Sequence, residues 1–225
     1  MKHFIFLGIF SFTILVQAQR SDFSTIDFQK ADEIARRYKG EDLSNLPVLS
    51  LQLTAQLKTD VERFRVIYKW VCENIKGNYH LTTESSYKQR KLRNDSIALF
   101  RWHHSFKKEI FTKLLQEKET LCTGYTYLIK EMSNLAGLEC EIINGFNEGY
   151  HLKKSGKEVP NHSWNAIKLN GKWYLCDATW SSGIIDMNGY NFIFQYDDSF
   201  FLMEPSNFAK SHTPIEEKWT LLEAN

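Results

Sequence analysis

The sequence predicts an α+β domain, because helical patterns fill its first half and strand-like segments fill much of its second half. Three observations carry this expectation: a helix-capping pattern at residues 59–62, an apolar helical stripe after Cys122, and two strand-like segments joined by Asn170-Gly171. The chain has 225 residues, of which 43% are hydrophobic and 24% are charged, as is typical of a soluble globular protein. This length fits one domain with a small extension.

The overall composition argues against two classes of protein. The 28 basic and 27 acidic residues nearly balance, so they leave no electrostatic footprint for binding nucleic acid. The four cysteines are too few for a scaffold built on disulfides. We therefore expect an ordinary packed core and no nucleic-acid partner.

The first eighteen residues match the pattern of a secretory signal peptide. Lys2 precedes an apolar run over residues 4–16, and Val16 and Ala18 place small residues at the −3 and −1 positions of a cleavage site. The run is short for a membrane span of about 20 residues, which disfavours an uncleaved anchor. We expect a secreted or periplasmic protein with no stable membrane insertion after cleavage.

Two helices are expected before residue 78. The first covers residues 27–39, where apolar residues recur at helical spacing, and Gly40 follows as a stop. Residues 46–57 are apolar and fit either a strand or a loop. The second helix opens on the capping box of residues 59–62 and closes near Gly77.

Residues 78–110 are the least readable part of the chain. Their basic cluster fits a solvated face, and a second interpretation is a rim that faces acidic groups of a substrate. His103 and His104 are adjacent, so their side chains point apart, and we expect no metal site. The basic residues are Lys88, Arg90, Lys91, Arg93, Lys107 and Lys108.

Cys122 is expected in the first turn of a helix. Tyr125, Leu128 and Met132 follow it at helical spacing, and Gly137 supplies a stop. The start of a helix carries partial positive charge and unsatisfied N–H groups, which lower the pKa of a thiol and stabilise an oxyanion. The position alone also fits a buried structural cysteine.

His162 and Asp177 are expected on one face of a β-hairpin. Residues 162–169 and 172–179 are strand-like, and Asn170-Gly171 is a strong two-residue turn signal. Such a turn fixes the register and makes His162 and Asp177 diagonal neighbours. A carboxylate beside an imidazole fixes its tautomer and raises its basicity, as in the base–orienter half of a catalytic triad.

Three segments of the chain resemble the core motifs of the transglutaminase-like superfamily, whose Cys, His and Asp follow in that order. They are residues 121–125, 161–167 and 173–180. Flanking residues resemble the kyphoscoliosis-peptidase-like branch, so that the resemblance spans roughly residues 60–223. Its closing segment contains His212, which we expect to be structural.

The resemblance implies a papain-like core in which a cysteine-bearing helix packs on an antiparallel sheet. It implies Cys122 as nucleophile, His162 as base and Asp177 as orienter in acyl transfer through a thioester. We expect a secreted bacterial-type enzyme with a protein or peptide substrate and neither cofactor nor metal. The expected substrate contacts are Trp164, Trp180 and Tyr125. The expected oxyanion donors are the Cys122 backbone, Trp102 and Tyr79.

Several alternatives stay open at this point. A Cys-His-Asp triad serves a peptidase or amidase, which hydrolyses the thioester, and equally a transglutaminase-type enzyme, which passes the acyl group to an amine. A third alternative is an inactive fold that binds protein or glycan. We divide the chain into a signal peptide (1–18), a partly helical N-terminal extension (19–58) and a transglutaminase-like catalytic domain (59–225).

Overall fold

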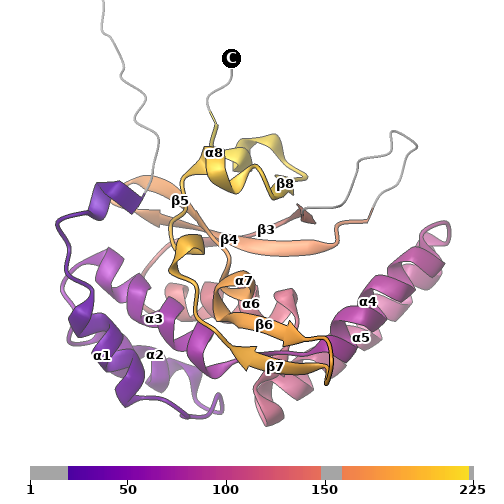
Figure 1. Cartoon of the computed structure of the whole chain (residues 1–225), viewed down its shortest axis with the longest axis horizontal. Coiled ribbons are helices and arrows are strands. Elements are labelled where there is room, and N and C mark those ends of the chain that lie inside the picture. The colour runs from indigo at the N-terminus through magenta and orange to yellow at the C-terminus, as the bar shows by residue number, and fades with distance from the viewer. Residues whose placement is uncertain (1–19, 148–158, 223–225) are drawn as a thin grey trace, which may run out of the picture.

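The computed structural model of the chain describes residues 20–147 and 159–222. The expected signal peptide, residues 1–18, lies outside these ranges. Figure 1 shows a sheet above a group of helices, with one helical pair extending to the side. Within residues 20–147 and 159–222, no helix combines the length and apolarity needed to span a bilayer.

The two helices expected near the N-terminus are present. Helix α1 covers Gln29–Arg37 and helix α3 covers Asp60–Asn74. Thr59 caps α3 in the expected capping box, since its side chain accepts the N–H of Glu62 and its own N–H is bound by the Glu62 carboxylate. Helix α3 ends earlier than expected, because strand β1 (Lys76–Gly77) leaves it to pair with strand β2 (Glu119–Thr120).

The apolar segment that fitted a strand or a loop is instead a helix, α2, over Leu46–Thr54. The Asn45 side chain accepts the N–H of Val48 at 3.2 Å, and Pro47 lies in the first turn. An Asn cap followed by proline starts a helix, and this local chemistry outweighs the absence of clear helical periodicity.

The poorly readable basic stretch forms two long helices, α4 (Tyr79–Leu92) and α5 (Ser96–Glu117). We call this pair the helical arm; it extends to the right in Figure 1. Leu81 is the buried residue of α4, and α5 buries three apolar side chains, whereas most other side chains of the arm face solvent.

The main sheet is antiparallel with the strand order β5-β4-β3-β8. Its strands are β3 (Cys140–Asn147), β4 (His162–Leu169), β5 (Lys172–Cys176) and β8 (His212–Pro214). Helix α6 (Cys122–Leu135) packs against β3 and β4 in one apolar core. The expected α+β class, with the cysteine-bearing helix on an antiparallel sheet, is therefore confirmed.

The register of the β4–β5 hairpin is as predicted, with Leu169 opposite Lys172. However, β5 ends at Cys176, three residues earlier than expected. Asp177 leaves the strand and becomes the N-cap of helix α7 (Ala178–Ser182), because its carboxylate accepts two backbone N–H groups of that helix.

The segment before the capping box shares the main core with the rest of the chain. Ile34 of α1 and Leu53 of α2 are buried in one cluster with Phe64 of α3, Ile129 of α6 and Ile167 of β4. The remaining elements are β6 (Gly183–Asp186), β7 (Asn191–Phe194), α8 (Pro205–Phe208) and the short 3₁₀ helices Arg20–Phe23, Asp198–Phe200 and Glu217–Thr220.

Candidate active site

Cys122 is the first residue of helix α6 and is half-buried. Leu121 precedes it and supplies no side-chain cap. The backbone N–H groups of Cys122 and Thr123 have no hydrogen-bond partner among the described residues. Gly124 is required here, because a Cβ at this position would come within 2.0 Å of the Thr120 hydroxyl. The helix start is therefore compact, uncapped and able to stabilise negative charge.

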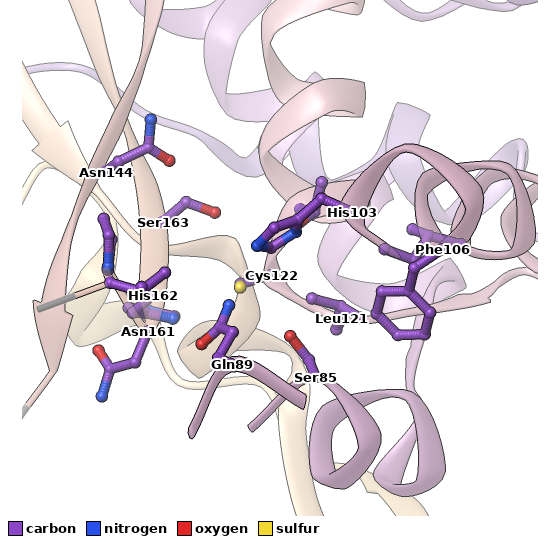
Figure 2. Close-up of a pocket in the computed structure, with 14 residues that line it drawn as sticks. Ser85, Gln89, His103, Phe106, Leu121, Cys122, Asn144, Asn161, His162 and Ser163 are labelled. Carbon is purple, nitrogen blue, oxygen red and sulfur yellow. The ribbon is translucent and has the colours of Figure 1, made fainter. Parts of the chain in front are cut away.

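His162 and Asp177 lie together beside Cys122. The Nε2 atom of His162 lies 2.6 Å from Oδ2 of Asp177, and both side chains are buried. Because Asp177 occupies Nε2, the other ring nitrogen, Nδ1, is free of the carboxylate, and His162 lowers the pKa of the nearby Cys122 thiol. Figure 2 shows the sulfur of Cys122 between the strand that carries His162 and the side chains of the helical arm.

The ionisation of these three groups is coupled. Burial opposes the charge of Asp177, but the adjacent His162 and His212 keep its pKa well below the usual range. Burial alone would lower the pKa of His162, whereas the charge and hydrogen bond of Asp177 raise it to about 10. Burial likewise opposes the Cys122 thiolate, yet His162 and Ser163 bring its pKa below the ordinary value. This combination favours a thiolate–imidazolium pair.

Cys122 is distinguished from the other three cysteines, which are free thiols buried in the core. Burial raises the pKa of Cys140 to about 12, and it also raises the pKa of Cys72 and Cys176. A raised pKa keeps a thiol protonated and unreactive at neutral pH. Only Cys122 has the electrostatic surroundings of a nucleophile.

A second histidine contacts Asp177. The Nε2 atom of His212 lies 3.1 Å from Oδ2 of Asp177, and its side chain is fully buried. His212 was expected to be structural, because it falls in the closing segment of the resemblance and outside the three core motifs. No local spacing links it to Asp177, which is 35 positions away.

The cluster of His162, Asp177 and His212 is also the kind of donor set that ligates a metal ion. One ligating atom from each residue lies within 4.8 Å of the others. Of the adjacent pair His103 and His104, at which no metal site was expected, His103 lines the pocket described next. The short hydrogen bonds within the cluster already satisfy the Asp177 carboxylate.

A pocket of about 340 Å³ opens beside the Cys122 sulfur, between the helical arm and the sheet. Ser85 and Gln89 of α4 and His103 of α5 form one side, as Figure 2 shows. No Asp, Glu, Lys or Arg is among its described lining residues, which are Ser85, Gln89, His103, Phe106, Ile110, Leu121, Cys122, Thr123, Asn144, Val159, Pro160, Asn161, His162 and Ser163.

Two of the three expected substrate contacts, Tyr125 and Trp164, are buried. Tyr125 is fully buried and donates its hydroxyl to the carbonyl oxygen of Ile75 at 2.7 Å. Trp164 is 1% exposed and packs against Phe208 in the core. Neither side chain lines the pocket, because Tyr125 packs in the main core and Trp164 packs in a second apolar cluster. Trp180 is half-buried and stacks on His162, with ring centroids 5.7 Å apart.

The expected oxyanion donors occupy different positions. The Cys122 backbone N–H is unpaired among the described residues, as required of such a donor. Trp102 packs in a small apolar cluster that also contacts Cys122, with its ring stacked on Phe106. Tyr79 stacks on Tyr190 at 4.4 Å. Neither Trp102 nor Tyr79 lines the pocket.

Comparison with known proteins places these features in context. The sequence profile of the transglutaminase-like superfamily matches residues 48–178. Human Kyphoscoliosis peptidase is 32% identical over 197 residues, which cover 87% of this chain and 27% of that protein. Hillarin of Drosophila melanogaster is 26% identical over 211 residues, which cover 88% and 23%. The chain thus spans about a quarter of the length of these curated relatives. A crystal structure of a TGase aligns with a TM-score of 0.38 and 14% identity, covering 74% of this chain and 34% of that one.

Proposed function

Because the chain belongs to the transglutaminase-like superfamily, we propose that it is a cysteine-nucleophile enzyme that transfers acyl groups from peptide or amide carbonyls. The observation that carries this proposal is the position of Cys122, which begins a helix and lines the same pocket as His162, while Asp177 holds the His162 ring at 2.6 Å. The lowered pKa of this thiol supports the same role. An inactive binding module would not need this arrangement.

In the proposed mechanism, His162 accepts the thiol proton at Nδ1 and Asp177 stabilises the resulting imidazolium through Nε2. The thiolate attacks the carbonyl carbon, and the Cys122 backbone N–H stabilises the oxyanion. The imidazolium then protonates the leaving amine, and the acyl group remains on sulfur as a thioester. Water or a second amine attacks this thioester and releases the enzyme.

We favour water as the acyl acceptor, and thus a peptidase or amidase. A lysine acceptor is a cation, and no carboxylate is among the described residues that line the pocket. The arm beside the pocket is rich in Lys and Arg, which repel a cationic amine. The signal-peptide pattern of residues 1–18 supports a secreted or periplasmic compartment. The proposal further takes the chain as a bacterial-type member of the superfamily that acts on a protein or peptide substrate.

The test is the rate at which iodoacetamide modifies each cysteine, measured by peptide mass spectrometry between pH 5 and 9. We expect Cys122 to react about 10²-fold faster than Cys140 at pH 6–7, and His162→Ala to abolish this difference. Equal reactivity of the two thiols would contradict the proposal. Casein incubated with and without a primary amine then separates hydrolysis, which yields new carboxylates or peptides, from transfer, which incorporates the amine.

A further inference from the structure

The Asp177 carboxylate is fully buried and accepts four hydrogen bonds. Its Oδ1 atom accepts the backbone N–H groups of Thr179 at 2.8 Å and Trp180 at 3.2 Å. Its Oδ2 atom lies 2.6 Å from Nε2 of His162 and 3.1 Å from Nε2 of His212. Each oxygen thus serves two donors, and His212 competes with His162 for one oxygen.

The ring of His212 is held in the orientation that this contact needs. It stacks on Phe208 at 3.9 Å and packs against Trp180 at 4.6 Å. Its Nδ1 atom lies 2.9 Å from the hydroxyl oxygen of Ser211, which is placed to donate to it. Nε2 then carries the proton that His212 donates to Asp177.

Strand β8 brings His212 to the site through a close approach to β3. Gly145 of β3 pairs with His162 on one side and with Pro214 of β8 on the other. A Cβ at position 145 would lie 2.2 Å from the carbonyl oxygen of Thr213, which no real side chain tolerates. Glycine here lets the strands that carry the two histidines flank the same residue.

We propose, building on the proposed function, that His212 is a positioning residue that moderates the hold of Asp177 on the His162 proton. A hydrogen bond donated to a carboxylate stabilises its charged form and makes it a weaker base. Without His212, the Oδ2 atom of Asp177 serves His162 alone and stabilises its imidazolium further. An imidazolium that is too weak an acid slows proton transfer to the leaving amine.

The test compares two variants of similar size. His212→Leu removes the donor, whereas His212→Gln keeps an N–H near the position of Nε2. Because a more stable imidazolium preserves the thiolate, we expect iodoacetamide to modify Cys122 down to about one pH unit lower in the Leu variant than in the parent protein. The Gln variant is expected to follow the parent profile.

Turnover supplies a second readout. An acyl p-nitroanilide needs a proton on its leaving amine, whereas the matching p-nitrophenyl ester releases a phenolate without one. We expect His212→Leu to lower kcat about 10-fold for the anilide and less than about 2-fold for the ester. If the Leu variant does not fold, as judged by its unfolding temperature, His212→Asn removes the same donor with a shorter side chain.

An alkylation profile in His212→Leu that is unchanged or displaced to higher pH would overturn this role. That result differs from failure of the proposed function, in which Cys122 of the parent protein reacts no faster than Cys140. A Gln variant that behaves like the Leu variant would also overturn the inference, because the retained donor would then have no effect.

A second inference comes from the charge of the helical arm. Residues 88–108 carry seven basic residues and one acidic residue, Asp95, so acidic residues outnumber basic ones in the rest of the chain. Asp95 is engaged as the N-cap of α5. None of the seven basic side chains forms an ion pair with residues 20–147 or 159–222; they are Lys88, Arg90, Lys91, Arg93, Arg101, Lys107 and Lys108.

This charge continues from the pocket wall. Arg93, the C-cap of α4, follows Gln89 by four residues in helical conformation, and Lys107 follows His103 by four residues on α5, so each lies one turn beyond a residue that lines the pocket. The part of the pocket lining that the structure describes contains no Asp, Glu, Lys or Arg. We infer that the substrate is a polypeptide with acidic residues that bind the arm, while a neutral residue enters the pocket beside Cys122.

Octaglutamate, octaserine and octalysine are the probes for this inference, and protection of Cys122 from iodoacetamide is the readout. We expect octaglutamate alone to slow alkylation about fivefold at 0.05 M salt, and the effect to vanish at about 0.5 M salt. Arg93→Glu with Lys107→Glu is expected to remove it. Lys30→Glu with Lys210→Glu makes the same charge change away from the arm and should leave it intact.

Protection by octaserine as strong as by octaglutamate would overturn the inference, as would no protection by any peptide. So would protection by vesicles containing phosphatidylserine in the absence of protection by octaglutamate, because the basic arm would then serve a lipid surface. The proposed function is tested separately, by the rate at which iodoacetamide modifies Cys122 when no peptide is present.

Discussion

The two sides of the pocket are built differently. On one side, the Asp177 cluster (Cys122, His162, Asp177 and His212) is largely buried, and Asp177 binds both histidines within it. On the other side, the helical arm buries few side chains, and most of its polar groups face solvent. Hydrogen bonds shielded from water hold the side chains of the cluster. A few buried apolar side chains hold the arm against the rest of the protein.

This difference indicates that the cluster controls the reactivity of Cys122, whereas the arm controls which molecules reach it. A buried polar group that loses its partner costs far more than an exposed one, so changes in the cluster should alter reactivity and folding together. Exposed elements tolerate substitution, and they commonly carry specificity on a rigid scaffold. Changes in the arm should therefore alter which molecules reach Cys122 while leaving the reactivity of the thiol unchanged.

The largest effect is expected from Cys122→Ala. Loss of the nucleophile should lower kcat/KM at least about 10³-fold, measured with the p-nitroanilide, because no other cysteine has a lowered pKa. Cys140→Ala is the matched control, since it removes a buried thiol whose pKa is raised to about 12. Comparable losses in both variants would contradict the assignment of the nucleophile.

Asp177→Asn should have the next largest effect. The carboxylate is what raises the pKa of His162 to about 10, so the neutral amide lets that pKa fall and the pKa of Cys122 rise. We expect alkylation of Cys122 at pH 6–7 to slow about 10²-fold and its profile to move to higher pH. A profile that stays in place would show that Asp177 does not control the thiol.

The same substitution has a consequence for stability. The pKa of Asp177 is lowered by folding, so its ionised form stabilises the fold above about pH 4, and this contribution is lost as pH falls further. The unfolding temperature of the parent protein should therefore fall more steeply between pH 5 and 3 than that of Asp177→Asn. Parallel curves for the two proteins would contradict this linkage.

Local sequence rules predicted the parts of the site that adjacent residues determine. The start of α6 at Cys122 and the register around Asn170-Gly171 follow from a helical stripe and a two-residue turn. The cap formed by Asp177 was missed because a strand-like sequence continues past it, while its carboxylate binds the following N–H groups. His162 still contacts Asp177, because Asp177 lies at the open end of the hairpin whether it is the last part of the strand or the cap of α7.

Two features of the structure could not be predicted from the local periodicity of the sequence. His212 reaches Asp177 because β8 pairs with β3 at Gly145, a contact between residues far apart in the chain. Helix α2 lacks an apolar stripe at helical spacing, since Ser50, Gln52 and Thr54 alternate with leucines, and its Asn45 cap indicates the helix instead. An alternation of polar and apolar residues is typical of a strand, so periodicity did not predict the helix.

Gly145→Ala tests whether strand pairing supports the cluster. The added methyl group meets the Thr213 backbone and the Trp164 ring, neither of which moves easily, so we expect a loss of about 2–3 kcal/mol in the free energy of unfolding. Gly171→Ala is the control: it meets no atom within 4 Å but has a φ of 81°, so it should cost about 1 kcal/mol. Urea denaturation measures both, and equal losses would show that the approach of β8 is not tight.

The smallest effect is expected in the arm, from Ser85→Leu. The larger side chain narrows the pocket from the α4 side without touching the cluster, so iodoacetamide, a small reagent, should modify Cys122 at the parent rate. The bulkier N-phenylmaleimide should react about fivefold more slowly, and the free energy of unfolding should stay within about 0.5 kcal/mol. Ser86→Leu places the same side chain at the next, exposed position, which does not line the pocket, and should leave both rates unchanged. If Ser85→Leu slows both reagents alike, the arm affects the reactivity of the thiol itself. That result would contradict the assignment of reactivity to the cluster and of access to the arm.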